Sequence, residues 1–157
     1  DRNVSLLAAA ARRFGLIPLA GKASGLRQPV HADDLADLAL RALTAAAPLD
    51  RVSPACGGST LAYREMARRI AAAVPRRAHL LTLPAGLLAA LLPLVSRLGG
   101  WWGLDIGLNA EMARRQNRDL VFDDSALRQA LAWSPRPFAP TAADFAIPPA
   151  ARALQLP

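Results

Sequence analysis

The sequence is poor in several residue types on which common kinds of protein depend. Its 157 residues include one cysteine, Cys56, so no internal disulfide framework can form, which fits a reducing compartment. They include one tyrosine, Tyr63, and they contain no phosphate loop of the G-x-x-x-x-G-K-[ST] or G-x-G-x-x-G kind. The first residues show no secretory signal, because no basic stretch leads into an apolar run and a cleavage site. We therefore expect a cytoplasmic protein without its own phosphate-binding loop.

The chain is basic, with a formal charge of +7 from 19 cationic and 12 acidic residues. All the cations except Lys22 are arginines, and many occur as pairs: Arg12–Arg13, Arg68–Arg69, Arg76–Arg77 and Arg114–Arg115. Pairs scattered along amphipathic helices usually form solvated faces. Aromatic residues make up only 5% and no nucleic-acid-binding motif is present, which counts against nucleic acid. A basic module for anionic lipid or nucleic acid is therefore the alternative function.

Short apolar segments alternate with amphipathic ones, which predicts α/β organisation. We expect strands over residues 17–20, 28–32, 52–56 and 79–83. We expect helices from Asn3 to a stop at Gly15, from a cap at Asp33 to Leu43, and over residues 63–74, 85–98, 109–117 and 124–131. Residues 135–149 are expected to form an extended surface tail.

The stretch from Ala78 to Ser96 carries no charged residue when His79 is neutral. Its length approaches the roughly 20 residues that a transmembrane helix needs. Pro84 and Pro93 interrupt it, and residues 79–83 are better explained as a strand. We expect a buried or partner-facing helix after Pro84, and contact of this helix with a membrane surface remains the alternative.

Arg27 is the strongest candidate for a binding residue. It precedes an expected strand, where a guanidinium beside a cleft can form a forked, charge-assisted pair with phosphate. A structural salt bridge to Asp33, Asp34 or another acid is the competing interpretation, because arginine is usually found at surfaces. The residues alone favour the structural role.

Asn3 and His31 also have two interpretations each. Asn3 suits a helix cap, and the same helix start would offer free N–H groups to an anion. His31 has no partner at a metal-binding spacing, so a structural histidine is the commoner role. Cys56 has no activating partner and is expected to be an inert buried thiol, while residues 57–59 are expected to form a tight turn. No catalytic residue and no metal ligand is predicted.

Four segments match one family's pattern in order. Residues 1–3 have Asp-Arg-Asn, and residues 27–36 follow R-x-x-V-H-V-x-D-hydrophobic-A except at Ala32. Residues 55–65 follow N-x-G-G-x-x-x-S-Y-R-E except at Ala55 and Ala62, and residues 124–138 follow D-S-x-x-R-x-x-L-G-W-x-P-R-P-F except at Ala132. Through these segments the chain resembles the extended short-chain dehydrogenase/reductase family, specifically its NAD-dependent epimerase/dehydratase branch.

The resemblance implies an α/β fold that comprises the C-terminal part of a Rossmann-like doubly wound sheet and a mostly helical substrate-binding lobe. Residues 1–157 would form one C-terminal segment. Family members carry an N-terminal half with a G-x-x-G-x-x-G loop for NAD(P) and a catalytic Tyr-x-x-x-Lys. Neither motif is present here, since Ala67 is the fourth residue after Tyr63. We therefore expect the segment alone neither to catalyse nor to bind NAD or NADP.

By the same resemblance, Arg27 corresponds to a position that contacts substrate diphosphate, Asn3 to a substrate-binding asparagine, and His31 to a motif residue beside them. The implied function is the binding of a nucleotide sugar or related anionic small molecule within an NAD(P)-dependent epimerase, dehydratase or reductase. The expected partners are a second copy of the chain or the missing N-terminal half. The nearly apolar segment 84–98 departs from the pattern and leaves a lipid-linked sugar or an atypical redox substrate open.

Overall fold

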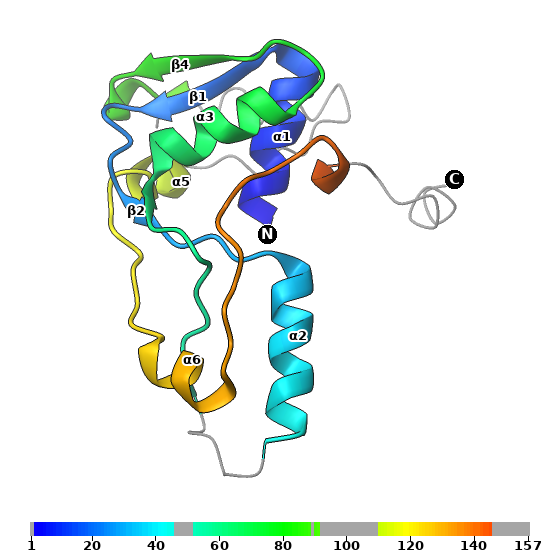
Figure 1. The fold of residues 1–157 in the computed structure, drawn as a ribbon. Helices are drawn as coiled ribbons and strands as arrows, with labels where there is room; N and C mark the ends of the chain where they lie inside the picture. Colours follow the sequence, from blue (N-terminus) through cyan, green and yellow to red (C-terminus); the bar gives the residue numbers. More distant parts are fainter. Residues whose placement is uncertain (1, 46–51, 89, 92–109, 146–157) are drawn as a thin grey trace, which may run out of the picture.

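The computed structural model describes residues 2–45, 52–88, 90–91 and 110–145. The elements follow in the order α1 (Arg2–Phe14), β1 (Leu16–Ala20), β2 (Leu26–Arg27), α2 (Ala32–Leu43), β3 (Leu61–Ala62), α3 (Tyr63–Ala73), β4 (His79–Leu83), α5 (Ala110–Arg115), α6 (Ser125–Leu131) and a 3-10 turn, η2 (Ala143–Phe145) (Figure 1). Residues 85–88 and 90–91 are also helical. This mixture of helices and a parallel strand pair confirms the expected α/β class.

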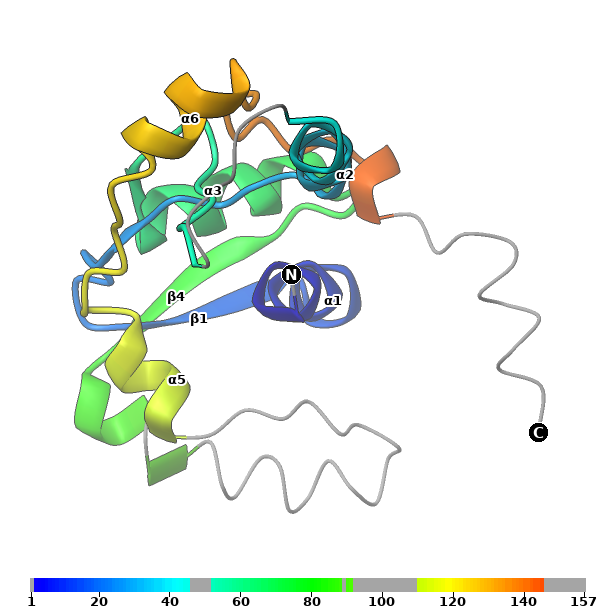
Figure 2. The same cartoon turned by 90° about the horizontal axis from the view of Figure 1, so that it is seen from below.

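The main core lies on one face of a small parallel sheet. β1 pairs with β4 in a register that runs from Leu16 opposite His79 to Ala20 opposite Leu83. Alternate residues of a strand face the same side, so Ile17 and Leu19 point together into a cluster with α1 and α3. Both side chains are fully buried. The carboxyl ends of β1 and β4 lie beside α5 (Figure 2).

The outer edge of β1 is closed by side chains. The Ala20 N–H donates to Oε1 of Gln116 at 2.7 Å, and Nδ2 of Asn117 donates to the Ala20 carbonyl at 2.7 Å. Pro18 has no N–H to offer at that edge. These side-chain amides occupy the positions that a further strand would need, so this part of β1 is not free to extend the sheet.

Two of the expected strands are wrong. β2 ends at Arg27, and the segment expected at residues 28–32 does not continue it, because Pro29 lacks an N–H and the side chain of Gln28 bonds Phe122 instead. The segment expected at 52–56 is not a strand, since the Cys56 N–H donates to Asp124 at 3.0 Å. The partner of β2 is β3, through the antiparallel pair Arg27 and Leu61.

The predicted helix ends are confirmed only in part. Gly15 terminates α1 with a positive φ of 67° and donates its N–H to Ala11 at 2.9 Å. The two caps are wrong: α1 begins at Arg2, so Asn3 is already helical, and His31 rather than Asp33 caps α2. Nδ1 of His31 accepts from the Asp33 N–H at 3.1 Å and satisfies a free donor of the first turn.

The helices and strands predicted for β1, β4, α3, α5 and α6 are confirmed, and their bounds agree with the predicted ones within one or two residues. The expected helix at 85–98 is helical at 85–88 and 90–91, and residues 92–98 lie outside the described ranges. None of the helices in the described parts has the length and apolarity to cross a membrane. Residues 135–141 form the expected extended segment before η2, while 146–149 are not described.

α2 and α6 lie side by side below the sheet (Figure 1). Their contact is a second, smaller core around Leu127, Leu131 and Trp133, against which Leu38 of α2 packs. On the opposite side of α2, the apolar side chains of Leu40 and Leu43 are 65% and 83% exposed. α2 therefore presents apolar surface that the described part of the chain does not cover.

Gly57 lies where two backbone segments cross too closely for a side chain. A Cβ at this position would lie 1.7 Å from the Pro29 carbonyl oxygen, whereas a Cβ at Gly86 would meet nothing within 4 Å. We expect Gly57→Ala to lower the free energy of unfolding by about 3 kcal/mol or more through overpacking. Gly86→Ala, in a helix, should raise it by about 0.5–1 kcal/mol.

Urea unfolding monitored by tryptophan fluorescence measures both changes. Equal stability of the two variants would contradict the crossing of residues 29 and 57.

Candidate functional site

Pro29, in the link between β2 and α2, lines two cavities. The larger, of about 430 Å³, is lined by α1, by the residues before α2 and by the segment that leads into η2. The smaller, of about 220 Å³, is lined by Arg27, Cys56 and Tyr63 among others. The larger lies within the size range of small-molecule sites, so we take it as the candidate functional site.

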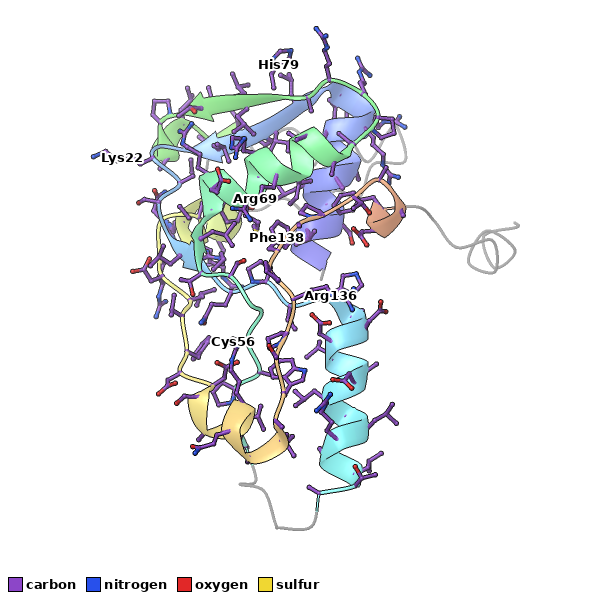
Figure 3. All side chains as sticks on the ribbon, in the orientation of Figure 1. Lys22, Cys56, Arg69, His79, Arg136 and Phe138 are labelled. Carbon is purple, nitrogen blue, oxygen red and sulfur yellow. The ribbon has the colours of Figure 1, made fainter. Side chains whose placement is uncertain are left out.

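A buried carboxylate binds Arg136, one of the residues that line the larger cavity. Asp34, in the first turn of α2, accepts from the Arg136 backbone N–H at 3.0 Å and from its Nε at 2.8 Å. The Asp34 carbonyl also accepts from Nε1 of Trp133 at 3.1 Å. Arg136 lies at the upper end of α2, next to the segment that carries Phe138 (Figure 3). The two hydrogen bonds from Arg136, together with the bond from Trp133, hold residues 133–138 against α2.

His31 is held at both of its ring nitrogens. Nδ1 accepts the Asp33 N–H, so in the neutral ring the proton lies on Nε2, which faces Oδ1 of Asp144 at 3.3 Å. Ser5 lines the same cavity. The combination of Ser5, His31 and Asp144 cannot work as a nucleophilic triad in this geometry, because no ring nitrogen is left to take a serine proton.

Asp144 joins η2 to the cavity. Its Oδ2 accepts from the Thr141 backbone N–H at 2.6 Å and from the Thr141 hydroxyl at 2.9 Å. These two bonds, and a smaller contribution from His31, lower the pKa of the Asp144 carboxyl. The carboxylate is therefore charged at neutral pH and stabilises the turn that closes this side of the cavity.

Arg27 is bound to backbone rather than to an acid. Nη1 donates to the carbonyls of Leu26 and Arg118 at 2.7 and 2.6 Å, and Nη2 donates to the carbonyl of Arg115. Its guanidinium carbon also lies 5.5 Å from the ring centre of Tyr63. The salt bridge considered from sequence, to Asp33 or Asp34, is wrong, since Asp34 binds Arg136. Three of the five guanidinium N–H groups are occupied, which leaves Nε–H and one Nη2–H.

The other residues singled out from sequence are structural. Burial raises the pKa of the Cys56 thiol, and nearby Asp124 raises it further, so the thiol is protonated at neutral pH. The N–H groups of Gly57 and Gly58 donate to the carbonyls of Gln28 and Arg136 at 3.2 and 3.1 Å. No phosphate could use these donors, so the turn expected at residues 57–59 is not a phosphate loop.

Much of the positive charge is engaged within the fold. Glu65 accepts from Arg68 and Arg69, and these bonds lower the pKa of its carboxyl to about 2. Arg69 also donates to the Phe138 carbonyl at 2.7 Å, and Arg64 donates to Thr82 at 3.0 Å. The expectation that the arginine pairs are only solvated faces is therefore wrong for Arg69, which ties α3 to the segment along the larger cavity.

The structure groups the three predicted binding residues only in part. His31 lines the larger cavity together with Val4 and Ser5 of α1, whereas Arg27 lines the smaller one. Asn3 lies in the first turn of α1, and its side chain is outside the described part of the chain. Their roles as substrate-binding residues stay predictions.

Sequence reasoning missed Arg136 and Asp144. Arg136 stands in a segment that matched the family pattern, which was the available signal, whereas nothing in the sequence pointed to Asp144. In the described ranges, no three His, Cys, Asp or Glu side chains gather as a metal site would require.

Comparison with known proteins shows the fold and no more. An NADPH-dependent quinone oxidoreductase (QOR2) from Escherichia coli matches with a TM-score of 0.57 and 22% identity, over 91% of this chain and 50% of that one. The complex of QOR2 with NADPH matches with a TM-score of 0.56 and 23% identity, over 87% of this chain and 47% of that one. The protein gox2253 matches with a TM-score of 0.51 and 17% identity, over 88% of this chain and 40% of that one. No family model and no curated protein matches the chain.

The chain therefore has an α/β, Rossmann-like fold that also occurs in these three solved structures, and it spans about half of their length or less. The narrower likeness of its motifs to epimerases and dehydratases remains part of the proposal below.

Tyr63 should ionise only at very high pH. Burial raises its pKa from 10 to about 12, although Arg27 lowers it. Because Tyr63 is the single tyrosine, absorbance at 295 nm follows its phenolate alone. We expect little phenolate below pH 11 in the folded protein. Since the unfolded state loses this proton first, the free energy of unfolding should fall by about 2 kcal/mol between pH 10 and 12.

A phenolate midpoint near 10 in the folded chain, at a pH where the far-ultraviolet circular dichroism is unchanged, would show that Tyr63 is not buried as described.

Proposed function

We propose that this chain is the substrate-binding portion of an NAD(P)-dependent enzyme of the reductase or epimerase type. The cofactor-binding half, with its glycine-rich loop and its acid–base tyrosine, would lie outside these 157 residues. The likeness in fold to about half of an NADPH-dependent oxidoreductase supports this proposal. The absence of G-x-x-G-x-x-G and Tyr-x-x-x-Lys from the sequence supports it too. In the whole enzyme NAD or NADP would supply hydride transfer.

The observation that carries the proposal is a preformed cavity in which the side chains of His31 and Asp144 are hydrogen-bonded to each other and to the backbone. Its wall is fixed by Asp34 and Arg136, and its histidine has both nitrogens engaged. Tyr63, with a pKa of about 12, lies in the smaller cavity and is a poor proton donor at neutral pH. Such a site can orient a substrate, and the proton and hydride transfers would come from groups on the other half.

A nucleotide sugar is the substrate we propose, with its diphosphate at Arg27. The guanidinium keeps two N–H groups beyond its three bonds to carbonyls, and Arg27 lines the smaller cavity. Two parallel N–H donors on one cation suit a phosphate. Pro29 lines both cavities, so a diphosphate at Arg27 would lie next to the larger site.

The apolar face of α2 gives the cofactor-binding half a surface on which to pack. Leu40 and Leu43 are 65% and 83% exposed, and the solved relatives in fold are about twice as long as this chain. The closed edge of β1 argues against the addition of a strand there. We propose that the two halves meet through α2, in a cytoplasmic enzyme.

Isothermal titration calorimetry on the 157-residue chain tests the proposal, with UDP-glucose and NADPH as probes. We expect UDP-glucose to bind, NADPH not to bind, and no NADPH oxidation when an acceptor quinone is added. Arg27→Gln should weaken UDP-glucose binding about 10- to 100-fold, because a charge-assisted pair is lost. Lys22→Gln, in the exposed loop after β1, is the matched control and should change little.

Turnover by the chain alone, or NADPH binding without UDP-glucose binding, would overturn the proposed function. Circular dichroism of Arg27→Gln shows whether the variant keeps its fold, since Arg27 also donates to the carbonyls of Arg115, the last residue of α5, and Arg118.

A further inference from the structure

We propose that the amino end of the sheet formed by β1 and β4 docks on an anionic lipid bilayer. This end, called the basic end of the sheet from here on, combines exposed apolar side chains with exposed arginines: Arg13, Phe14, Leu16, Arg76, Arg77 and Leu81. None of the six lines either cavity, so binding at the basic end does not depend on the proposed function.

One face of this sheet is exposed at the amino end. Because alternate residues face opposite sides of a strand, Leu16 and Pro18 lie on the face away from the main core. The register places His79 beside Leu16 and Leu81 beside Pro18 on that face. Figure 3 shows His79 on the side of the sheet away from α3. Leu16 and Leu81 are 41% and 43% exposed, so this part of the face presents apolar surface to solvent.

The carboxyl end of the same face is covered. Ala20 and Leu83 pack with Leu88 and Ala113 in a separate small core. In the described part of the chain, the uncovered apolar surface of this face is therefore confined to its amino end, where α1 ends and β4 begins.

Three exposed arginines border the uncovered surface. Nη1 of Arg76 donates to the Arg13 carbonyl at 3.0 Å, and Arg13 takes part in that contact only through its backbone. A Cβ on Gly15 would lie 3.3 Å from Nε of Arg76 and 3.4 Å from the Arg77 carbonyl oxygen. Gly15 directly precedes Leu16, so the three arginines lie at the edge of the exposed apolar face.

The positive charge of these arginines is not compensated by nearby acids. Among the described residues, no carboxylate lies within ion-pair distance of Arg13, Arg76 or Arg77, whereas α2, α3 and α5 each have an arginine paired with an acid of the same helix. Anionic headgroups would supply the missing counter-charges, and each arginine near such a surface strengthens binding about fivefold.

The apolar side chains favour a bilayer over a soluble polyanion. Phe14 is 46% exposed, and it follows Arg13 directly at the end of α1. Together with Leu16 and Leu81 it can enter the boundary between headgroups and acyl chains while the arginines meet lipid phosphates. A nucleic acid would use the arginines alone and leave the leucines in water.

Vesicle sedimentation on the 157-residue chain tests the proposal. The probes are vesicles of equal parts phosphatidylcholine and phosphatidylglycerol, and vesicles of phosphatidylcholine alone. We expect the chain to bind the mixed vesicles and to bind the uncharged ones much more weakly. Binding to the mixed vesicles should be largely lost when the ionic strength is raised to about 0.5 M, because salt screens the arginines.

Two variants separate the charged and the apolar contributions. Arg13→Gln/Arg77→Gln removes two exposed cations and should weaken binding to the mixed vesicles at least about 10-fold. Leu81→Ser removes apolar contact and should weaken it about 3- to 10-fold. Circular dichroism shows whether each variant keeps its fold.

The chain offers a matched control for each variant. Arg114→Gln/Arg118→Gln removes the same charge from exposed positions on α5 and after it, beside the carboxyl ends of the strands. Val121→Ser removes an apolar side chain that is 43% exposed, as Leu81 is, in the segment between α5 and α6. Both controls should bind the mixed vesicles nearly as well as the unmodified chain does.

No binding to the mixed vesicles, equal binding to the two kinds of vesicle, or equal losses in variants and controls would each overturn the proposal. Retention on heparin without vesicle binding would assign the arginines to a soluble polyanion and would overturn it as well.

Discussion

The contact between Asp34 and Arg136 is the constraint on which the candidate site depends. Asp34 is only 9% exposed, and its carboxylate accepts hydrogen bonds from both the backbone and the side chain of Arg136, which is 102 residues away. Burying such a carboxylate is costly unless it is paired and hydrogen-bonded. The same contact keeps residues 133–138 against α2, which places Phe138 and the segment toward η2 along the cavity.

The other charged contacts repeat this pattern of arginines that hold backbone segments. Arg128 donates to Asp124 and to the carbonyls of Cys56 and Gly57, and Arg27 donates to two carbonyls at and just beyond the end of α5. A high arginine content therefore reflects how the long irregular segments are fixed as much as it reflects ligand attraction. The described residues form two short strand pairs and small cores, so apolar burial alone holds these segments in place only weakly. The arginine contacts add to that stabilisation.

Features with a local physical cause were predictable from the sequence. The positive φ of Gly15, the alternation in β1 and the apolar spacing of α3 each depend on neighbouring residues, and all three were expected. The strand predictions failed at residues 28–32 and 52–56, where proline removes a donor and distant residues take the remaining bonds. The candidate site was predicted only in part. Arg136 pairs with Asp34 and Asp144 pairs with His31, each across more than 100 residues, which no local pattern shows.

Hydrogen exchange at single amides tests the central claim most directly, in Asp34→Ala beside Asp33→Ala as its exposed neighbour. The account predicts that the Arg136 amide exchanges at least about 10-fold faster when Asp34 is lost, since its acceptor is gone, while Ile17 and Leu19 in β1 keep their protection. Asp33→Ala should leave the Arg136 amide as it was. Equal protection of that amide in both variants would contradict the account.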